Sequence, residues 1–579
     1  MDFETDEQKI KHIEKTQQLL EQIRMPYEAM IDDVIRFVNH GRRTISEKDS
    51  AKGQRTGRDV YDGTALSAVN LASDGIHGYM CSSSIHWFDF TLPGKINFGR
   101  TSGMRAWTGK RLDEYPEVKI WLDECEEVQY AAFLRSNFYE FHPDYVREGM
   151  TIGTATGVIE EDIGSNRIVF TLPHFRECYI AENEFGAVDT LYRKYKLSLR
   201  QLVQKFGKEK IFKLGPSIAK EYENDIYAEK EILHSTFPRT DYDPDKVNGK
   251  NKPVASFWVM PGTQNKLIDE SGYHDLPTVT WRWRKNNDEL YGRSPSWDAL
   301  IDIKKGNQQA KTNLIAGHKM ADPPMVGPSD LRGKVNNTPH GWTWADNMTK
   351  ESIPQPLITG IQLPYGTDQQ DRTDAAIREH FHVDFFLMLS QAASNKVDLT
   401  ATQVIGMQGE QAAVLGTRIG RHQSEGLNPI MDRVFNIEMR AGRMPEPPQI
   451  LQDMAGQSIE IDYLGPLSQS QKKLFKMQGI RAGIEMAAQI MEVFPSSVDR
   501  IDGDKVIVEA LESVSFPSTC FNTDDKVEEI RTVRQKQGEA QASLAAMGEM
   551  AKGAQRLTRT VEDGSVLDNL TGEEDAGQV

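Results

Sequence analysis

The sequence predicts an α+β fold, because strand-like and helix-like patterns occupy different parts of its 579 residues. The first half alternates amphipathic helical stretches with short runs of β-branched and aromatic residues. The second half has mainly helical periodicity, which one long proline-rich segment interrupts. A chain of this length is expected to form about three or four structural units.

The first half is expected to begin with helices. Apolar residues recur at helical spacing over residues 6–24. Pro26 is expected to break or restart this helix, and a helical face then continues to Val38. Residues 41–58 are polar and basic, and we interpret them as a solvated linker, with a phosphate-contacting patch as the alternative. Further elements are predicted as follows: a helix at 65–80, a strand at 85–90 and one long helix at 116–149.

A β-rich stretch is expected next. The Gly-rich segment 153–157 is interpreted as a turn before a strand. Ser198 is a candidate N-cap for a short helix that ends near Gly207. Strands are predicted at 167–172, 188–197, 230–237, 254–260 and 278–284.

The second half is expected to start with a helix that Ser296 caps and that extends to about residue 319. Residues 321–365 carry seven prolines, which predicts an extended or β-hairpin excursion. A second helix is expected over about 369–391, and a polar break follows it.

A very long helical tract is then predicted over about 401–441, with a kink at Gly426 and Pro429. A proline-rich stop follows this tract at 445–448. The remaining predictions are helices at 468–492, 504–514 and 524–555, and a disordered acidic tail at 556–579.

The charge balance limits the kinds of function. Lysine and arginine number 68 and aspartate and glutamate 85, so the formal net charge is −17. A protein that grips nucleic acid tightly usually carries a basic domain, whereas an acidic wall can let a polyanion pass without holding it. The longest dense apolar run, residues 385–389, is far too short for a membrane span. The acidic N-terminus lacks a signal-peptide pattern, so a cytoplasmic protein is expected.

No motif in the sequence points to catalysis, a cofactor or a metal. The phosphate-binding P-loop, G-x-G-x-x-G, H-E-x-x-H and G-x-S-x-G patterns are all absent. His380 and His382 would suit a metal, but a helix would point them apart. The four cysteines, expected as isolated reduced thiols, are far apart: Cys81, Cys125, Cys178 and Cys520.

Four stretches occur in an order and spacing that resembles the portal, or head-to-tail connector, family of short-tailed double-stranded DNA bacteriophages. They are Gly153-Thr154-Ala155 before Glu160-Glu161-Asp162, then 189–193 through 201–207, then 291–295, and finally 400–404, which opens the long helix. The resemblance covers roughly residues 115–520, and none of these stretches is catalytic.

The resemblance implies a portal-type subunit with an α+β wing, a two-helix stem, a β/loop clip, a long kinked helix and a helical crown. The implied parts are the wing body at 1–294, the first stem helix at 295–320, the clip at 321–366, the second stem helix at 367–390, the channel loop at 391–400, the long kinked wing helix and return at 401–466, the crown at 467–555 and the tail at 556–579.

The resemblance also implies a non-enzymatic function without cofactors. A homo-oligomeric ring, usually a dodecamer, would stand at one capsid vertex of the virion after assembly in the host cytoplasm. It would conduct double-stranded DNA during packaging and ejection, and would dock the terminase and then tail adaptors. Major capsid and scaffolding proteins, and internal core or ejection proteins, are further implied partners, and no membrane is. The alternatives are a soluble enzyme of unknown chemistry, or a tail or collar adaptor without a DNA channel.

Site residues follow from this assignment. A ring cannot keep register with a duplex of different symmetry, so weak phosphate contacts are expected rather than base readout. The channel-loop candidates are Gln391, Ser394, Asn395 and Lys396. Lys396 would form one ring of positive charge, and the alternative is an ordinary solvated lysine.

Clip and stem candidates are also implied. Clip candidates for binding partners are Arg332, Lys334, Trp342 and Trp344. Tryptophan is a preferred hot-spot residue, but the two tryptophans could instead pack between neighbouring clips, and the basic pair could be a solvated edge. The stem-packing candidates, which could equally lie in a subunit core, are Phe385, Phe386, Leu387 and Met388.

Overall fold

The computed structural model is a mixed helix and sheet structure, as the sequence predicts. It describes residues 5–39, 57, 59–84, 86–91, 116–162, 164–240, 242–243, 248–263, 266–327, 329, 332, 336, 342, 353–357, 363–384, 386, 416, 420–449, 460–463, 479–487, 503–513 and 524–558. The chain divides into two compact units, Met1–Pro93 with Trp121–Lys472 and Gly94–Ile120 with Lys473–Val579.

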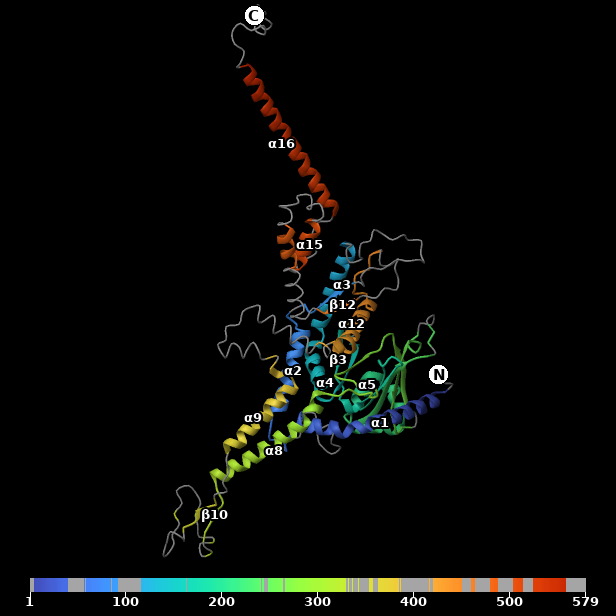
Figure 1. Ribbon diagram of the computed structural model, residues 1–579. Coiled ribbons are helices and arrows are strands. Elements are labelled where there is room, and N and C mark those ends of the chain that lie inside the picture. Colours follow the sequence, from blue (N-terminus) through green and yellow to red (C-terminus); the bar gives the residue numbers. More distant parts are fainter. Residues whose placement is uncertain are drawn as a thin grey trace, which may run out of the picture. The chain divides into compact units, whose positions relative to one another are not determined.

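The larger sheet of the first unit has five antiparallel strands in the order β4-β5-β6-β7-β8. The strands are β4 (Cys178–Glu182), β5 (Val188–Ser198), β6 (Glu229–Pro238), β7 (Val254–Val259) and β8 (Leu267–Tyr273). Every residue of β7 is buried, because side chains from both faces of the sheet are covered. Phe257 packs with Leu20 of α1 (Asp6–Phe37), whereas its neighbour Trp258 packs with Leu202 on the other face. Figure 1 shows α1 beside this sheet.

Helix α1 contradicts the predicted break at Pro26, because it continues through the proline for 32 residues. Residues on both sides of Pro26 are anchored. Leu20 and Ile31 are buried in separate core clusters, and the guanidinium of Arg24 donates to the carbonyls of Cys178 (3.0 Å) and Arg176 (2.9 Å). This tertiary packing outweighs the one hydrogen bond that a proline removes from a helix.

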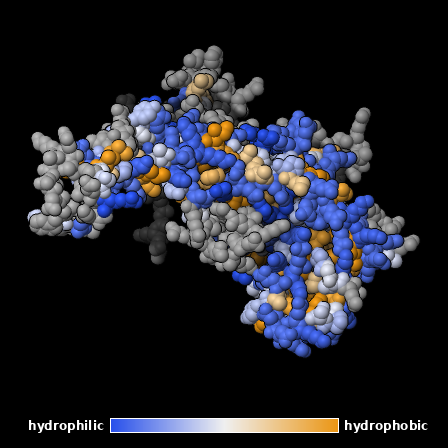
Figure 2. All heavy atoms as spheres, turned by 90° about the horizontal axis from the view of Figure 1, so that it is seen from below, coloured by the Kyte–Doolittle hydropathy of each residue, from blue (hydrophilic) through white to orange (hydrophobic). Residues whose placement is uncertain are grey.

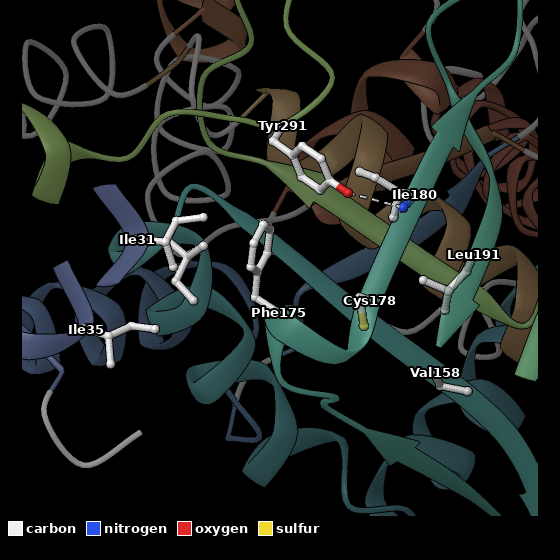
Figure 3. Packing of buried hydrophobic residues seen from close by; sticks show 9 residues of the cluster. Ile31, Ile35, Val158, Phe175, Cys178, Ile180, Leu191 and Tyr291 are labelled. Atoms are coloured by element: carbon white, nitrogen blue, oxygen red, sulfur yellow. Dashed lines mark hydrogen bonds between the residues drawn. The ribbon is translucent and has the colours of Figure 1, made fainter. Parts of the chain in front are cut away.

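The smaller sheet has the strand order β3-β2-β9, with β2 (Thr154–Asp162), β3 (Arg167–Thr171) and β9 (Thr278–Arg282). The turn predicted at 153–157 is therefore wrong for all but its first residue. Gly157 lies within β2, and its lack of a side chain leaves room for the Phe141 ring, which a Cβ would approach to 2.7 Å. A third core cluster joins this sheet to α1 and β4, and Figure 3 shows the hydrogen bond that the Ile180 amide donates to the Tyr291 hydroxyl.

The long helix predicted at 116–149 is also wrong, since two helices occupy this stretch, α3 (Pro116–Arg135) and α4 (Phe138–Thr151). The break lies at Ser136 and Asn137. The Asn137 amide donates to the Phe170 carbonyl and accepts from the Phe170 amide, both at 2.8 Å. A side chain that pairs with the backbone of β3 stabilises the non-helical corner.

Gly153 holds the junction between α4 and the smaller sheet. Its φ is +100°, and a Cβ at this position would lie 2.3 Å from the carbonyl oxygen of Gly292. We expect Gly153→Ala to destabilise the chain by about 1–3 kcal/mol in urea unfolding, because it combines a left-handed backbone with a clash. Gly262→Ala is the matched control, with φ +84° and open space, so an equal loss in both variants would contradict the role of the close approach.

The remaining predictions for the first half are largely confirmed. The helix α2 (Thr64–Met80) and the strands β3, β5, β6, β7 and β9 lie where expected, and β1 (Phe88–Thr91) overlaps the second half of its predicted range. Ser198 and Gln201 form a capping box for α5 (Leu199–Phe206), and Gly207 ends it. Elements that were not predicted are β4, β8, α6 (Lys208–Phe212) and α7 (Pro216–Asn224).

In the second half, α8 (Pro295–Ala321) and α9 (Leu363–His380) confirm the paired helices around the proline-rich segment. The cap of α8 is Ser294 rather than the predicted Ser296. The helix predicted over 369–391 is interrupted after His380, because His382 adopts a φ of +54° before helical residues resume at 383.

The described part of the long tract, from residue 420, is helical as predicted. It consists of the π-helical turn η5 (His422–Leu427) followed by α12 (Asn428–Arg440). Strand β12 (Glu460–Tyr463) then pairs antiparallel with β1. In the second unit, residues 479–487, α15 (Gly503–Ser513) and α16 (Asp524–Thr558) confirm the predicted helices over their described parts.

Candidate functional site: the paired helices α8 and α9

Helix α8 is fixed at its start to the end of α4. The Ser294 hydroxyl caps the helix by accepting from the Trp297 amide, and it donates to the Thr151 carbonyl at 2.6 Å. The Ser296 hydroxyl donates to the Met150 carbonyl at 2.9 Å. Both serines are buried, so the first turn of α8 is held firmly against the body of the first unit.

Helices α8 and α9 lie side by side, as Figure 1 shows. The Asn313 amide donates to the Gly366 carbonyl (3.1 Å) and to the Gln370 side chain (2.9 Å). A Cβ on Gly366 would lie 2.4 Å from the Asn313 side chain, so glycine permits this close approach. Nearer the body, His380 Nε2 lies 3.4 Å from the carboxylate of Asp302.

Helix α8 leaves several apolar side chains uncovered by its own chain. Ile301 is 80% exposed and Leu314 is 50% exposed, although both belong to a helix whose first turns are buried. The other large exposed apolar side chains on these two helices are Ile315, Met320 and Tyr365. Figure 2 shows a face of the molecule that is mainly hydrophilic and is interrupted by hydrophobic patches. Several large apolar side chains exposed along one helix are a candidate surface for another protein to cover.

The two helices also differ in charge. Helix α8 carries four lysines against two aspartates, whereas α9 carries two arginines against three aspartates and one glutamate. Lys305 and Lys319 are exposed on α8, and Asp371 and Glu379 are exposed on α9. The pair therefore presents a net positive helix beside a net negative one.

The clip candidates lie beyond the ends of these helices, where β10 (Met325–Val326) pairs with β11 (Gln355–Pro356). Arg332 is exposed and Trp342 is 76% exposed. Lys334 and Trp344 lie outside the described residues. The apolar side chains of this two-stranded ribbon, Met325 and Val326, are exposed as well.

The other predicted site residues are only partly described. Phe386 approaches α2 so closely that a Cβ on Gly75 would come within 2.5 Å of its ring. All four channel-loop candidates lie outside the described residues, as do the stem candidates Phe385, Leu387 and Met388. The role of the channel-loop candidates therefore stays a prediction.

The two residues predicted to kink the long helix lie at an irregular helical segment. Gly426 is within the π-helical turn and Pro429 is in the first turn of α12. A Cβ on Gly426 would lie 3.0 Å from the His422 ring, so this turn is closely packed. Single π-helical turns often occur at functional sites.

Sequence reasoning missed the ion-pair network that attaches this π-helical turn to the smaller sheet. Arg282 of β9 is almost fully buried, and its guanidinium binds Glu425 of the turn (2.9 Å) and Glu182 of β4. The same side chain donates to the Gly186 carbonyl at 2.9 Å. Arg282 and Glu425 are 143 residues apart. No local sequence pattern could have paired them.

Three imidazoles, of which His142 and His422 are buried and His77 is half-buried, form a chain next to the same turn. His142 Nδ1 is 2.9 Å from His77 Nδ1, and His142 Nε2 is 3.0 Å from His422 Nε2. Burial lowers the pKa of His142 well below its usual value and lowers the pKa of His422 to about 3. These rings are therefore neutral in the folded chain and act as packing and hydrogen-bonding groups.

The neutral imidazoles predict a loss of stability in acid. Below pH 6.5 the unfolded chain protonates His422 but the folded chain does not, so the free energy of unfolding falls as the pH decreases. We expect His422 to account for a loss of about 2 kcal/mol between pH 7 and pH 5. Urea unfolding at both pH values checks this, because His422→Phe should reduce the difference by that amount. An unchanged pH dependence in the variant would contradict it.

The structure also locates the histidines that the sequence raised as candidate metal ligands. Across the part of the chain that is described, no three histidine, cysteine or acidic side chains are placed to hold a metal ion. Because α9 ends at His380, that residue and His382 line one pocket of about 330 Å³ together with Asp298 and Glu379, contrary to the expectation that a helix would separate the two histidines.

The three described cysteines, Cys81, Cys125 and Cys178, are free and buried, which confirms the prediction of isolated thiols for them. Burial raises the pKa of Cys125 and of Cys178 to about 12, so neither is a ready nucleophile. Among the described helices, none combines the length and apolar character that crossing a membrane requires.

Comparison with known proteins gives the family. The chain is 28% identical over 546 residues to the portal protein of Salmonella phage epsilon15, and the aligned region covers 93% of each chain. It is 23% identical over 513 residues to the probable portal protein of Bordetella phage BPP-1, and the aligned region covers 88% of each chain. A family model described as bacteriophage head to tail connecting protein matches residues 10–521. The chain therefore belongs to the bacteriophage head-to-tail connecting protein family, whose members have a structural rather than an enzymatic role.

Proposed function

We propose that this chain is the portal subunit of a tailed phage and that identical copies of it close into a ring at one capsid vertex. The observation that carries the proposal is the family match over residues 10–521, which contains the whole α8–α9 pair. The exposed apolar side chains of α8 support it, because a monomer gains nothing by leaving Ile301 and Leu314 in water. The opposite charges of α8 and α9 suit a head-to-tail contact between neighbours.

In this proposal the elements take the parts of a portal subunit. The two sheets and α1 form the wing, α8 and α9 form the stem, and the β10–β11 ribbon begins the clip. The loop 391–400 faces the channel, and the π-helical turn with α12 belongs to the long wing helix. The second unit, with α15 and α16, forms the crown.

The ring would conduct double-stranded DNA into the capsid and out of it. Weak contacts from the channel loop, with Lys396 as its cation, would let the phosphates slide. The clip, with Arg332 and Trp342, would dock the terminase during packaging and tail adaptors afterwards. Capsid, scaffolding and internal core or ejection proteins would meet the outer surface, and the subunit would wait in the host cytoplasm before assembly.

A genetic experiment tests this function. Phage that lack the gene for this chain should assemble capsids that contain no genome, and supplying the chain in trans should restore infectious particles. Packaged capsids with a normal genome in the absence of the chain would contradict the proposal. Particles that package DNA but lack only tails would instead indicate an adaptor outside the channel.

A further inference from the structure

One part of the wing has a charge opposite to that of the chain as a whole. Residues 193–220 contain nine lysines and arginines against a single glutamate, in a protein with a net charge of −17. They cover the end of β5, the helices α5 and α6, and the start of α7. This local excess of positive charge lies far along the sequence from the predicted channel loop at 391–400.

The fold turns these cations outward. The apolar side chains of α5, α6 and α7, including Leu202, Ile211 and Ile218, are buried in one cluster with Trp258 of the larger sheet. The basic side chains of the same helices are exposed, and we call them the basic face: Arg200, Lys205, Lys208, Lys210, Lys213 and Lys220. Figure 1 shows α5 beside this sheet, so the basic face stands on a packed support.

Contacts within the chain leave much of this charge accessible. Lys205 lies 3.7 Å from Glu160, and Lys210 lies 2.7 Å from Asp269, both as partly exposed pairs. Pairs of this kind contribute about 0–1 kcal/mol, so a stronger anion can replace the carboxylate. Lys208 lies over the Tyr222 ring at 5.5 Å, a contact that keeps its full charge.

We infer that the basic face binds the phosphate backbone of duplex DNA, as a second DNA contact outside the predicted channel. Clustered, exposed lysines are the usual footprint of phosphate binding without sequence recognition. Lysine is depleted at the centres of protein interfaces, which rely on aromatic and apolar anchors. No large apolar side chain of α5, α6 or α7 is among the exposed ones that the described residues contain. A polyanion therefore fits this surface better than a protein partner does.

The acidic surroundings would limit where DNA can bind. Because the rest of the chain carries a large excess of acidic groups, a duplex is repelled elsewhere and is attracted to the basic face. Binding would be weak, independent of sequence and sensitive to salt. The wing would then hold or guide nearby DNA without the tight grip that would stop it from moving.

The test is DNA binding by the full-length protein in a salt titration. The variant replaces Lys208, Lys213 and Lys220 by glutamine. Its affinity for a fluorescent duplex of mixed sequence is measured by anisotropy between about 50 and 200 mM salt, a range over which the loss of a few phosphate contacts changes the affinity measurably. We expect at least a tenfold loss at the lower salt concentration. The slope of log K against log salt should fall by about 0.9 for each lost contact.

A matched control removes the same charge from the second unit. Lys526, Arg534 and Lys536 are exposed on α16, and replacing them by glutamine should leave the affinity and the salt slope unchanged. All six side chains are exposed, so both variants should melt like the wild type. An unchanged slope in the basic-face variant, or an equal loss in both variants, would overturn the inference. So would lost ring assembly with unchanged DNA binding, since the face would then pair with a second copy.

This inference does not depend on ring formation. If the wild-type chain stays a monomer and the basic-face variant still loses DNA binding, the inference holds and the proposed ring fails. If rings form and the variant binds DNA like the wild type, the ring holds and the inference fails.

Discussion

Replacing both Ile301 and Leu314 by aspartate is expected to abolish ring assembly and to leave the subunit folded. Both side chains are already exposed in the single chain, so the substitutions should change its stability by less than about 0.5 kcal/mol. In a ring they would be buried at every contact between neighbours, where a carboxylate without a partner costs several kcal/mol. Mass photometry should therefore find monomers, while the circular dichroism spectrum and melting temperature stay those of the wild-type subunit.

Conservative substitutions at the same two positions provide the control. Ile301→Leu with Leu314→Met keeps the apolar area and nearly the same volume, so rings should form as in the wild type. Rings of normal size from the double aspartate variant would show that α8 does not form the contact between subunits. Unfolding of that variant would show that Ile301 and Leu314 support the subunit itself.

Replacing Arg282 by methionine is expected to cost about 3–5 kcal/mol of folding stability, the loss typical when one partner of a buried ion pair is removed. Arg282 is 1% exposed and joins β9 to Glu425 in the π-helical turn and to Glu182 in β4. Its loss leaves both carboxylates close together in a poorly hydrated site, with Lys285 beside Glu182 at 2.6 Å. Urea unfolding followed by tryptophan fluorescence measures this loss, because Trp281 and Trp283 flank Arg282.

A double-mutant cycle tests whether the ion pair itself is responsible. Glu425→Gln combined with Arg282→Met should cost clearly less than the sum of the two single changes, because the same contact is removed only once. Arg284→Met is the exposed control. Its partner Asp298 lies 3.2 Å away and both side chains are nearly half exposed, so a loss below about 1 kcal/mol is expected. Equal losses for Arg282 and Arg284 would contradict the network.

Local signals in the sequence predicted much of the fold. The capping box of Ser198 and Gln201 and the terminating Gly207 fixed α5, because both ends of a short helix depend on neighbouring residues. The same holds for the proline at the start of α8 and for the strands with β-branched runs. Signals of this kind act within four residues, and the amino-acid sequence displays them directly.

Elements that depend on distant contacts could not be predicted. Strand β2 begins in a glycine-rich run because the Phe141 ring needs the space at Gly157, and α1 continues through Pro26 because Arg24 is bound to carbonyls more than 150 residues away. The cap of α8 is Ser294, two residues earlier than expected, and its hydroxyl also donates to the Thr151 carbonyl. In each case tertiary packing reversed a local preference.

Some parts of the candidate site could be predicted from the sequence and others could not. The helices α8 and α9 and the ribbon between them followed from periodicity and proline content, whereas their exposed apolar side chains needed a structure. The ion pair of Arg282 with Glu425 and the contact of His142 with His422 join residues 143 and 280 positions apart. The channel-loop assignments stay predictions, because residues 391–400 are outside the described part of the chain.

The mass and shape of the purified full-length chain test the central claim most directly. Twelve copies of a 65.4 kDa subunit would weigh about 785 kDa, and negative-stain images should show an annulus with a hole wide enough for a DNA duplex. A closed ring of this kind is the predicted result. A particle of one or two subunits under all solution conditions, or a solid particle without a central hole, would contradict the account.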